Sequence, residues 1–410
     1  MPEFLNLLLP SQALNKLSEA ISFKPSEEIV STKDALGRVI SHPVIAPHPL
    51  PTFSRSAVDG YAVKARDTFG ASESAPAYLR IIGEVPMGGS YQDEVNPGEC
   101  VLIHTGGMLP VGIDAVVMLE YTQIIKESDV EILRAVAVGE NVIMAGEDVE
   151  AGQVVLQSGT VLRPAELGGL MALGLTSVSV YQKLKVAIIS TGDEIVPPEK
   201  ILQPGQVRDI NSYSLAGLVQ NAGAEALVLG IIPDKEEALY QKVQEALALS
   251  DLVLITAGSS ASMRDLTAKV ITQLGPPGVL VHGINIRPGK PTIFGICRGK
   301  PVIGLPGNPI SALVIGWLLV DPIIRKMSGI IQRLSKPVIY ARLSANIPSQ
   351  AGREDWIPVE LVEQDDGILA KPIFFKSNLI FNLARADGLL CIPADQTGLL
   401  AGQNVEVYLY

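Results

Sequence analysis

Three apolar runs in the middle of the chain each end in a loop of small residues. They are 184–190 (LKVAIIS), which leads into Thr191-Gly192-Asp193-Glu194; 252–256 (LVLIT), which leads into Ala257-Gly258-Ser259-Ser260 and then Asp265; and 301–305 (PVIGL), which leads into Pro306-Gly307-Asn308-Pro309. A helical pattern follows each loop, and a further strand-like run spans 225–232. Strands that alternate with helices in this way predict a doubly wound parallel α/β sheet over about 181–328.

These loops combine small residues with acids. In an open parallel sheet they gather at the carboxyl edge of the strands, where ligands bind, and glycine and serine let backbone N–H groups approach an anion. The carboxylates of Asp193, Glu194 and Asp265 would repel a phosphate unless a cation lay between them, and a hard divalent ion such as Mg²⁺ is the usual solution. The residues therefore predict a site for a phosphorylated small molecule together with a metal ion.

Asp209, Asp234 and Asp265 also have a purely structural interpretation, as residues that cap the start of a helix. Asp234 with Glu237 three residues later matches a capping box. Capping and ligand binding are compatible, since both occur at the same helix end. Function is favoured because Glu194, Asp234 and Asp265 each follow a strand of the same predicted sheet.

Positive charge is concentrated in the turn Ile286-Arg287-Pro288-Gly289-Lys290-Pro291. Two cations that flank a rigid Pro-Gly turn suit an oxyanion or a phosphate, and the alternative is a surface turn with solvated cations. The histidines are scattered along the chain, so no Ser/His/Asp or Cys/His array supports covalent catalysis.

The flanking sequence predicts further domains. Prolines cluster near a boundary at 43–51, and residues 45–140 contain short apolar runs between Gly, Pro and Asp turns, which indicates a β-rich inserted domain. We expect residues 141–180 to pair with residues 1–44, forming one N-terminal domain in two pieces. Short strands over 329–410 predict a C-terminal β-barrel or sandwich.

Polar residues at three turns outside the α/β region are further candidates. Asp59 lies beside Gly60, Thr105 begins a Thr-Gly-Gly turn, and Ser377 lies in a Lys-Ser-Asn sequence. Asp59 and Thr105 are also explained as residues that cap local backbone, and Ser377 as part of a solvated loop.

Composition limits the class of protein. A chain of 410 residues predicts roughly two to four domains, and the net charge of 32 − 43 = −11 argues against nucleic-acid binding. Cys100, Cys297 and Cys391 show no metal-ligand spacing, so we expect buried thiols in a reducing cytoplasm. No signal peptide is indicated, and the longest apolar run, 312–320, is too short to span a bilayer, which needs ~20 residues. We therefore expect a cytoplasmic protein with neither nucleic-acid nor membrane partners.

Six motifs occur in a characteristic order. They are Ser56-Ala57-Val58-Asp59-Gly60-Tyr61-Ala62-Val63, the Thr105-Gly106 turn with Pro110 and Asp114-Ala115-Val116-Val117, Gly146-Glu147-Asp148, Ser190-Thr191-Gly192-Asp193-Glu194, Arg287-Pro288-Gly289-Lys290-Pro291, and Gly304-Leu305-Pro306-Gly307-Asn308-Pro309. Together they resemble the molybdopterin molybdenumtransferase family, which includes the C-terminal domain of gephyrin. The resemblance covers essentially the whole chain.

The resemblance implies an elongated homodimer with a two-piece N-terminal domain, a β-rich insert, a molybdopterin-binding α/β domain and a C-terminal β domain. It implies a transferase that takes adenylylated molybdopterin and molybdate, cleaves the adenylate with Mg²⁺, and yields molybdenum cofactor and AMP. It also implies contact with the molybdopterin adenylyltransferase and with cofactor-accepting enzymes.

The resemblance further implies roles for individual residues. The catalytic residues would be Asp59, Thr105, Glu194, Asp265 and Lys290, with Asp59 and Thr105 facing the partner subunit's site. The metal ligands would be Glu194, Asp234 and Asp265. The ligand-binding residues would be Gly192, Asp193, Gly258, Ser259, Ser260, Arg287, Gly307, Asn308 and Ser377.

One loop departs from the family pattern, which usually has glycines where this chain has Ser259 and Ser262. A side chain then stands where a backbone would approach the ligand. The alternative function is therefore a catalytically weak pterin-binding or scaffold homologue, or a tungstate-preferring paralogue. The retained Glu194, Asp234 and Asp265 favour catalysis.

Overall fold

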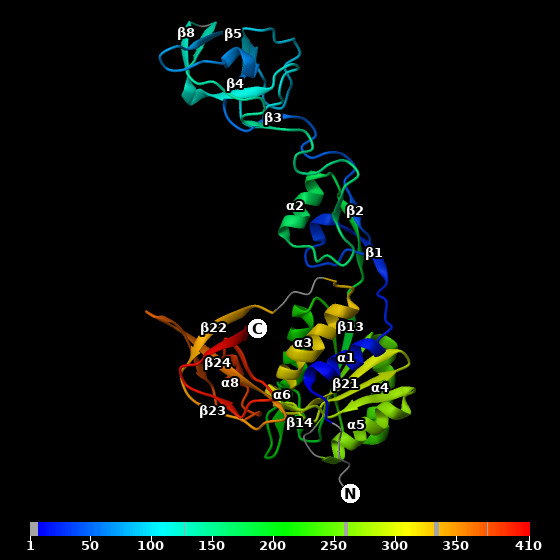
Figure 1. Cartoon of the computed structure of the whole chain (residues 1–410). Coiled ribbons are helices and arrows are strands. Elements are labelled where there is room, and N and C mark those ends of the chain that lie inside the picture. The colour runs from blue at the N-terminus through cyan, green and yellow to red at the C-terminus, as the bar shows by residue number, and fades with distance from the viewer. Residues whose placement is uncertain (1–6, 127, 258–260, 332–335, 375) are drawn as a thin grey trace.

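The computed structural model describes residues 7–126, 128–257, 261–331, 336–374 and 376–410, with the backbone alone for 261–264. The described chain is elongated: a β-rich region lies at one end, a small mixed module follows, and an α/β region and a β-barrel lie side by side at the other end (Figure 1). The predicted multi-domain α/β plus β fold is confirmed. No helix among the described residues is both long and apolar enough to cross a bilayer.

The α/β region is built on a sheet with the strand order β16-β13-β17-β21-β20-β18. The strands are β13 (Lys185–Thr191), β16 (Glu225–Ile232), β17 (Leu252–Ala257), β18 (Pro277–His282), β20 (Ile293–Cys297) and β21 (Lys300–Pro306). The first four strands of that order are parallel, as predicted, whereas β20 pairs antiparallel with both of its neighbours, β21 and β18. The reversal follows from the two-residue turn at Arg298 and Gly299, which both have positive φ and connect β20 directly to β21.

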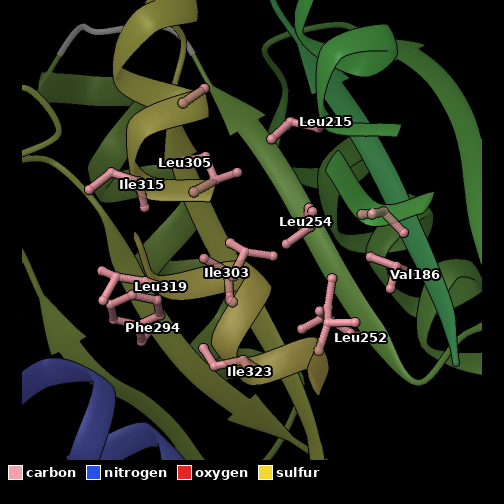
Figure 2. Packing of buried hydrophobic residues seen from close by; sticks show 14 of the residues in the cluster. Val186, Leu215, Leu252, Leu254, Phe294, Ile303, Leu305, Ile315, Leu319 and Ile323 are labelled. Atoms are coloured by element: carbon pink, nitrogen blue, oxygen red, sulfur yellow. The ribbon is translucent and has the colours of Figure 1, made fainter. Parts of the chain in front are cut away.

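Helices cover both faces of this sheet because successive strand side chains point to opposite sides. The helices are α3 (Asn211–Asn221), α4 (Glu236–Leu249), α5 (Ala261–Gln273), α6 (Pro309–Ile315), the π-helical segment η4 (Gly316–Val320) and α7 (Asp321–Met327). Val186, Leu252 and Leu254 pack with α3, α6 and α7 (Figure 2), while Ala187 and Val253 pack with α4 and α5. The expected doubly wound arrangement is therefore present.

The first helix, α1 (Pro10–Ala20), belongs to this core rather than to the N-terminal module. Its buried residues Ala13 and Leu17 join the cluster that contains α3 and α7. Lys16 Nζ also donates a hydrogen bond of 2.8 Å to the carbonyl of Leu280. The N-terminal segment is thus divided between two regions.

The small module is assembled from two separated segments, as expected. The pairing strands are β1 (Glu27–Ser31) with β12 (Ser177–Tyr181), and β2 (Val44–Ile45) with β11 (Val154–Leu156). Helix α2 (Pro164–Ala172) supplies Leu170 to their shared core.

The inserted region is a sheet of order β7-β4-β6-β5-β9-β8. Its strands are β4 (Gly60–Val63), β5 (Ala77–Glu84), β6 (Glu99–Ile103), β7 (Ala115–Met118), β8 (Thr122–Lys126) and β9 (Asp129–Ile132). Strands β3 (Arg55–Ser56) and β10 (Val142–Ile143) pair where the chain enters and leaves it.

The C-terminal region is a closed barrel, which confirms the barrel prediction. Its strands are β22 (Val338–Leu343), β24 (Glu354–Gln364), β25 (Gly367–Pro372), β26 (Gly388–Ile392) and β28 (Asn404–Leu409), and the pairing of β24 with β26 closes the ring. Strand β19 (Ile286–Arg287) of the α/β region pairs in parallel with β24 and places Arg287 opposite Asp355. The barrel and the α/β region therefore share a sheet edge.

Candidate active site

An acidic cluster lies at the carboxyl edge of the α/β sheet, after β13 and β16. The backbone N–H of Asp234 donates to Asp193 Oδ1 at 3.3 Å. Burial raises the pKa of Asp234, and the charges of Asp193 and Glu194 raise it further. A Cβ at Gly192 would lie 2.9 Å from Glu194 Oε2, so the glycine leaves room for that carboxylate. The structure thus brings together Gly192, Asp193, Glu194 and Asp234.

Asp234 does not cap the helix that follows it. Helix α4 begins at Glu236 after Lys235, and within the described residues its start has no side-chain cap, so the capping-box prediction is wrong. Oδ1 of Asp234 is instead buried without a hydrogen-bond partner among the described residues. An unpaired buried carboxylate oxygen is costly, and a cation satisfies it.

Asp265 lies apart from its expected place. Helix α5 begins at Ala261, so Asp265 is inside the helix and is not its N-cap. Gly258, Ser259 and Ser260 fall outside the described residues. No three Asp, Glu, His or Cys side chains in the described chain gather closely enough to hold a metal ion, so Glu194, Asp234 and Asp265 do not form a ready-made triad.

Polar contacts tie the neighbouring loops to this edge. Asp209 Oδ1 accepts a hydrogen bond of 3.1 Å from the backbone N–H of Ser212 in the first turn of α3, although the N-cap position of this helix is occupied by Ile210 and not by Asp209. Asn211 Nδ2 donates to the carbonyl of Gly307 at 2.8 Å, and so joins α3 to the loop after β21.

A pocket of about 960 Å³ lies between the α/β region and the barrel. Among the described residues, its cationic lining consists of Arg287, Lys290, Arg353 and Lys376. The predicted turn at 286–291 therefore forms part of a basic cavity.

The shape of this turn depends on Gly289. It has φ +113°, and a Cβ there would lie 2.4 Å from Ile315 Cδ1 on α6. The close approach of backbone and helix holds Arg287 and Lys290 at the pocket wall.

Two charged side chains at this junction, Arg353 and Asp355, were not among the candidate residues that the sequence suggested. Arg353 Nε donates to Asp355 Oδ1 at 2.8 Å, and Arg287 Nη1 lies 3.6 Å from Asp355 Oδ2. The sequence signal that could have found them is the charged residues directly before the apolar stretch that begins with Trp356.

Ser377 also reaches the pocket, and its hydroxyl accepts a hydrogen bond of 2.9 Å from Asn308 Nδ2. Its carbonyl accepts one of 3.1 Å from the backbone N–H of Ile310. Gly307, Asn308 and Ser377 are therefore linked across the two regions, and Ser377 is not merely part of a solvated loop.

Asp59 and Thr105 meet beside β4 and β6 of the β-rich region, and this region lies at the opposite end of the described chain from the α/β sheet (Figure 1). Thr105 donates to Asp59 Oδ1 from its backbone N–H at 2.8 Å and from its hydroxyl at 3.2 Å. The backbone hydrogen bond lowers the pKa of Asp59, and the Thr105 hydroxyl and the nearby His104 act in the same direction. The local capping interpretation holds, and within one chain these residues do not reach Glu194.

Three family models match successive parts of the chain. The model described as "MoeA N-terminal region (domain I and II)" matches residues 9–174, "Probable molybdopterin binding domain" matches 187–326, and "MoeA C-terminal region (domain IV)" matches 340–410. The fold and the site thus define a multi-domain protein built around a domain of the molybdopterin-binding class.

Relatives that match nearly the whole chain identify the family within this class. The chain is 34% identical over 389 residues to a molybdopterin molybdenumtransferase of Nostoc sp., covering 93% of this chain and 88% of that one, and 32% identical over 403 residues to that of Haemophilus influenzae, covering 98% of each. A crystal structure of a molybdopterin biosynthesis moeA protein from Pyrococcus horikoshii superposes with a TM-score of 0.86 at 34% identity, covering 99% of this chain and 100% of that one. The chain belongs to the molybdopterin molybdenumtransferase family. These relatives favour the transferase over the scaffold alternative.

Proposed function

We propose that this chain inserts molybdenum from molybdate into adenylylated molybdopterin and releases AMP. The family supports the reaction, and one observation in the structure carries it: Oδ1 of Asp234, beside Asp193 and Glu194, is buried and has no hydrogen-bond partner in the part of the chain that the structure describes. An acidic cluster of this kind needs a cation before it can accept a pyrophosphate.

The residues at this edge fit Mg²⁺, with Asp234 and Glu194 as its protein ligands. A bound Mg²⁺ would neutralise charge on the phosphoanhydride that is cleaved. Mg²⁺ commonly takes one or two carboxylates and completes its shell with phosphate oxygens and water, so a separate third carboxylate is not required. Asp265, which lies inside α5, is kept as a proposed catalytic residue on the basis of the family resemblance alone.

The basic pocket suits molybdate, the other substrate. Arg287 and Lys290 supply positive charge from the α/β region, and Arg353 and Lys376 supply it from the barrel. Arginine presents fixed donors that match oxyanion geometry. The loop of Gly307 and Asn308 connects this pocket with α3. Helix α3 lies in the chain between Glu194 and Asp234 of the acidic cluster.

Asp59 and Thr105 are assigned to the site of a partner subunit in a homodimer. The separation of the β-rich region from the α/β region supports this assignment, because residues at opposite ends of an elongated chain can share a site only if another copy supplies one of them. We also propose a cytoplasmic location, supported by the unpaired cysteines Cys100, Cys297 and Cys391, and hand-over contacts with the adenylyltransferase and cofactor-accepting enzymes.

The test is AMP release from adenylylated molybdopterin, with Mg²⁺ and molybdate each added or withheld. We expect release that requires both and that is lost in Asp234→Asn. Asp366→Asn is the matched control, because it removes a carboxylate that pairs with Arg342 on the exposed barrel surface. Release that is independent of molybdate, or that survives in Asp234→Asn, would contradict the proposal.

A further inference from the structure

Asp355 is a fully buried carboxylate at the start of β24, at the seam between the barrel and the α/β region. It accepts hydrogen bonds from Arg353 Nε at 2.8 Å and from Arg353 Nη2 at 3.3 Å. A buried carboxylate is stable only when it is paired, so this double contact fixes the Arg353 guanidinium as firmly as it fixes Asp355.

Arg287 approaches the same carboxylate differently. Its Nη1 lies 3.6 Å from Asp355 Oδ2, which is too long for a hydrogen bond. Its side chain is 59% exposed, compared with 27% for Arg353. Arg287 therefore keeps free donors that face the pocket.

The backbone holds the two arginines in this relationship. Strand β19 pairs with β24 so that Arg287 lies opposite Asp355, and the backbone N–H of Glu354 donates to the carbonyl of Asn285 at 3.1 Å. The Asn285 side chain also donates to the carbonyl of Gly352. Asp355 thus meets one arginine from each region at a rigid junction.

We propose that Asp355 is a positioning residue for the oxyanion substrate. Its hydrogen bonds fix Arg353 in the pocket wall. It is also the counterion of Arg287 until molybdate binds, and Arg287 then pairs with the molybdate instead. The role rests on the proposed function, since molybdate is the substrate of that reaction. The two arginines therefore have different roles: Arg353 presents hydrogen-bond donors in a fixed position, and Arg287 supplies a positive charge that can move toward the molybdate.

Asp355 has two opposing effects on anion binding, so it is informative whether a substitution raises or lowers the affinity for molybdate. Its negative charge reduces the attraction of the pocket for anions, whereas its hydrogen bonds hold Arg353 in the binding geometry. Positioning predicts that Asp355→Asn binds molybdate more weakly, although the variant pocket is one charge more positive.

The experiment measures the molybdate dependence of AMP release. For Asp355→Asn we expect the KM for molybdate to rise about tenfold or more, because the donors are no longer held in place, with kcat at saturating molybdate close to wild type. A merely structural role would lower kcat by reducing the folded fraction and would leave KM unchanged. An unchanged or lowered KM would overturn the proposal.

Arg353→Lys is the second variant, because lysine keeps the charge but cannot make both hydrogen bonds. We expect a similar rise in KM, and the double variant should show less than the product of the two single effects, since both remove the same contact. If the rises in KM of the two single variants multiply in the double variant, Asp355 does not act through Arg353 and the proposal is overturned. If Asp355→Asn fails to fold, the rise in KM of Arg353→Lys over the Asp366→Asn control decides the question.

Calorimetric titration with molybdate alone separates this inference from the proposed function. Wild-type protein that binds molybdate but releases no AMP would refute the reaction, and weaker binding by Asp355→Asn would still support the positioning role. No molybdate binding by the wild type would overturn both.

Discussion

The side-chain amide of Asn308 donates a hydrogen bond of 2.9 Å to the hydroxyl of Ser377, and this contact joins the start of α6 to the barrel region. The two residues are remote in sequence, and the basic pocket lies where their regions meet. The integrity of the pocket therefore depends on contacts that hold two regions of the chain together.

Ser377→Ala removes this acceptor and leaves Asn308 Nδ2 without it. We expect a loss of about 1 kcal/mol in unfolding free energy and a higher KM for molybdate, measured by denaturant titration and by AMP release. Ser74→Ala is the control, because it removes an exposed hydroxyl that lies 3.3 Å from Ser72 in the remote β-rich region. Equal effects of the two variants would show that the junction has no particular role.

Gly289→Ala tests the turn that presents Arg287 and Lys290. The new Cβ would meet Ile315 Cδ1 at 2.4 Å, in a backbone conformation with φ +113°. We expect a cost of about 2–4 kcal/mol from strain and overpacking and a loss of molybdate binding by calorimetry.

The control is Gly299→Ala, where φ is +80° but nothing lies within 4 Å of the added Cβ. It should cost about 1 kcal/mol for its backbone conformation alone and should bind molybdate normally. If Gly289→Ala behaved like this control, the packing against Ile315 would not shape the site.

Asp234→Asn should stabilise the metal-free protein at neutral pH while abolishing activity. Burial and the charges of Asp193 and Glu194 raise the pKa of Asp234 above its ordinary 3.8, so between that value and the raised one the folded chain holds a proton that the unfolded chain has released. Stability contributed by this group falls as pH rises through that window and stays reduced above it.

Thermal unfolding from pH 4 to 8 without divalent ions should therefore show a smaller decline for Asp234→Asn than for wild type. Added Mg²⁺ should raise the melting temperature of the wild type and not that of the variant. The control is Glu237→Gln on α4, the helix that follows Asp234. Glu237 is exposed and accepts a hydrogen bond from Gln241, and its variant should resemble the wild type in both respects. A Mg²⁺ response retained by Asp234→Asn would remove it as a ligand.

Mixing two inactive variants tests the shared site. If Asp59 acts in the site that contains Glu194 of the partner, a hybrid of Asp59→Asn and Glu194→Gln subunits has one intact site. After unfolding and refolding an equal mixture, about a quarter of wild-type activity should return, since half of the dimers are hybrids with one working site each. No recovery, with dimers demonstrated by ultracentrifugation, would place Asp59 outside the partner's site.

Much of the α/β region could be predicted because its signals are local. Apolar runs ending at Ser190, Thr256 and Leu305 predicted strands, and the small residues after them predicted loops at one sheet edge. The helix starts were less predictable. Asp234 matches a capping box, yet its N–H donates to Asp193, and α4 starts after Lys235 instead.

The basic pocket shows what a linear pattern leaves out. Arg287 and Lys290 were candidates because they flank a recognisable turn, but nothing near Asp355 in the sequence indicates that two arginines converge on it. Its role depends on the pairing of β19 with β24, which joins segments from different regions.

The sequence by itself determined the elements, the layering of the α/β region and the family, because hydrophobic period, turn residues and ordered motifs act over short stretches of chain. Only the tertiary structure decided which charges meet. Asp234 has an oxygen without a hydrogen-bond partner among the residues that the structure describes, while Asp355 is neutralised by arginines from two regions. The physical reason is that the energy of a charge is set by burial and by neighbours within a few ångströms, and those neighbours come from segments that only folding brings together.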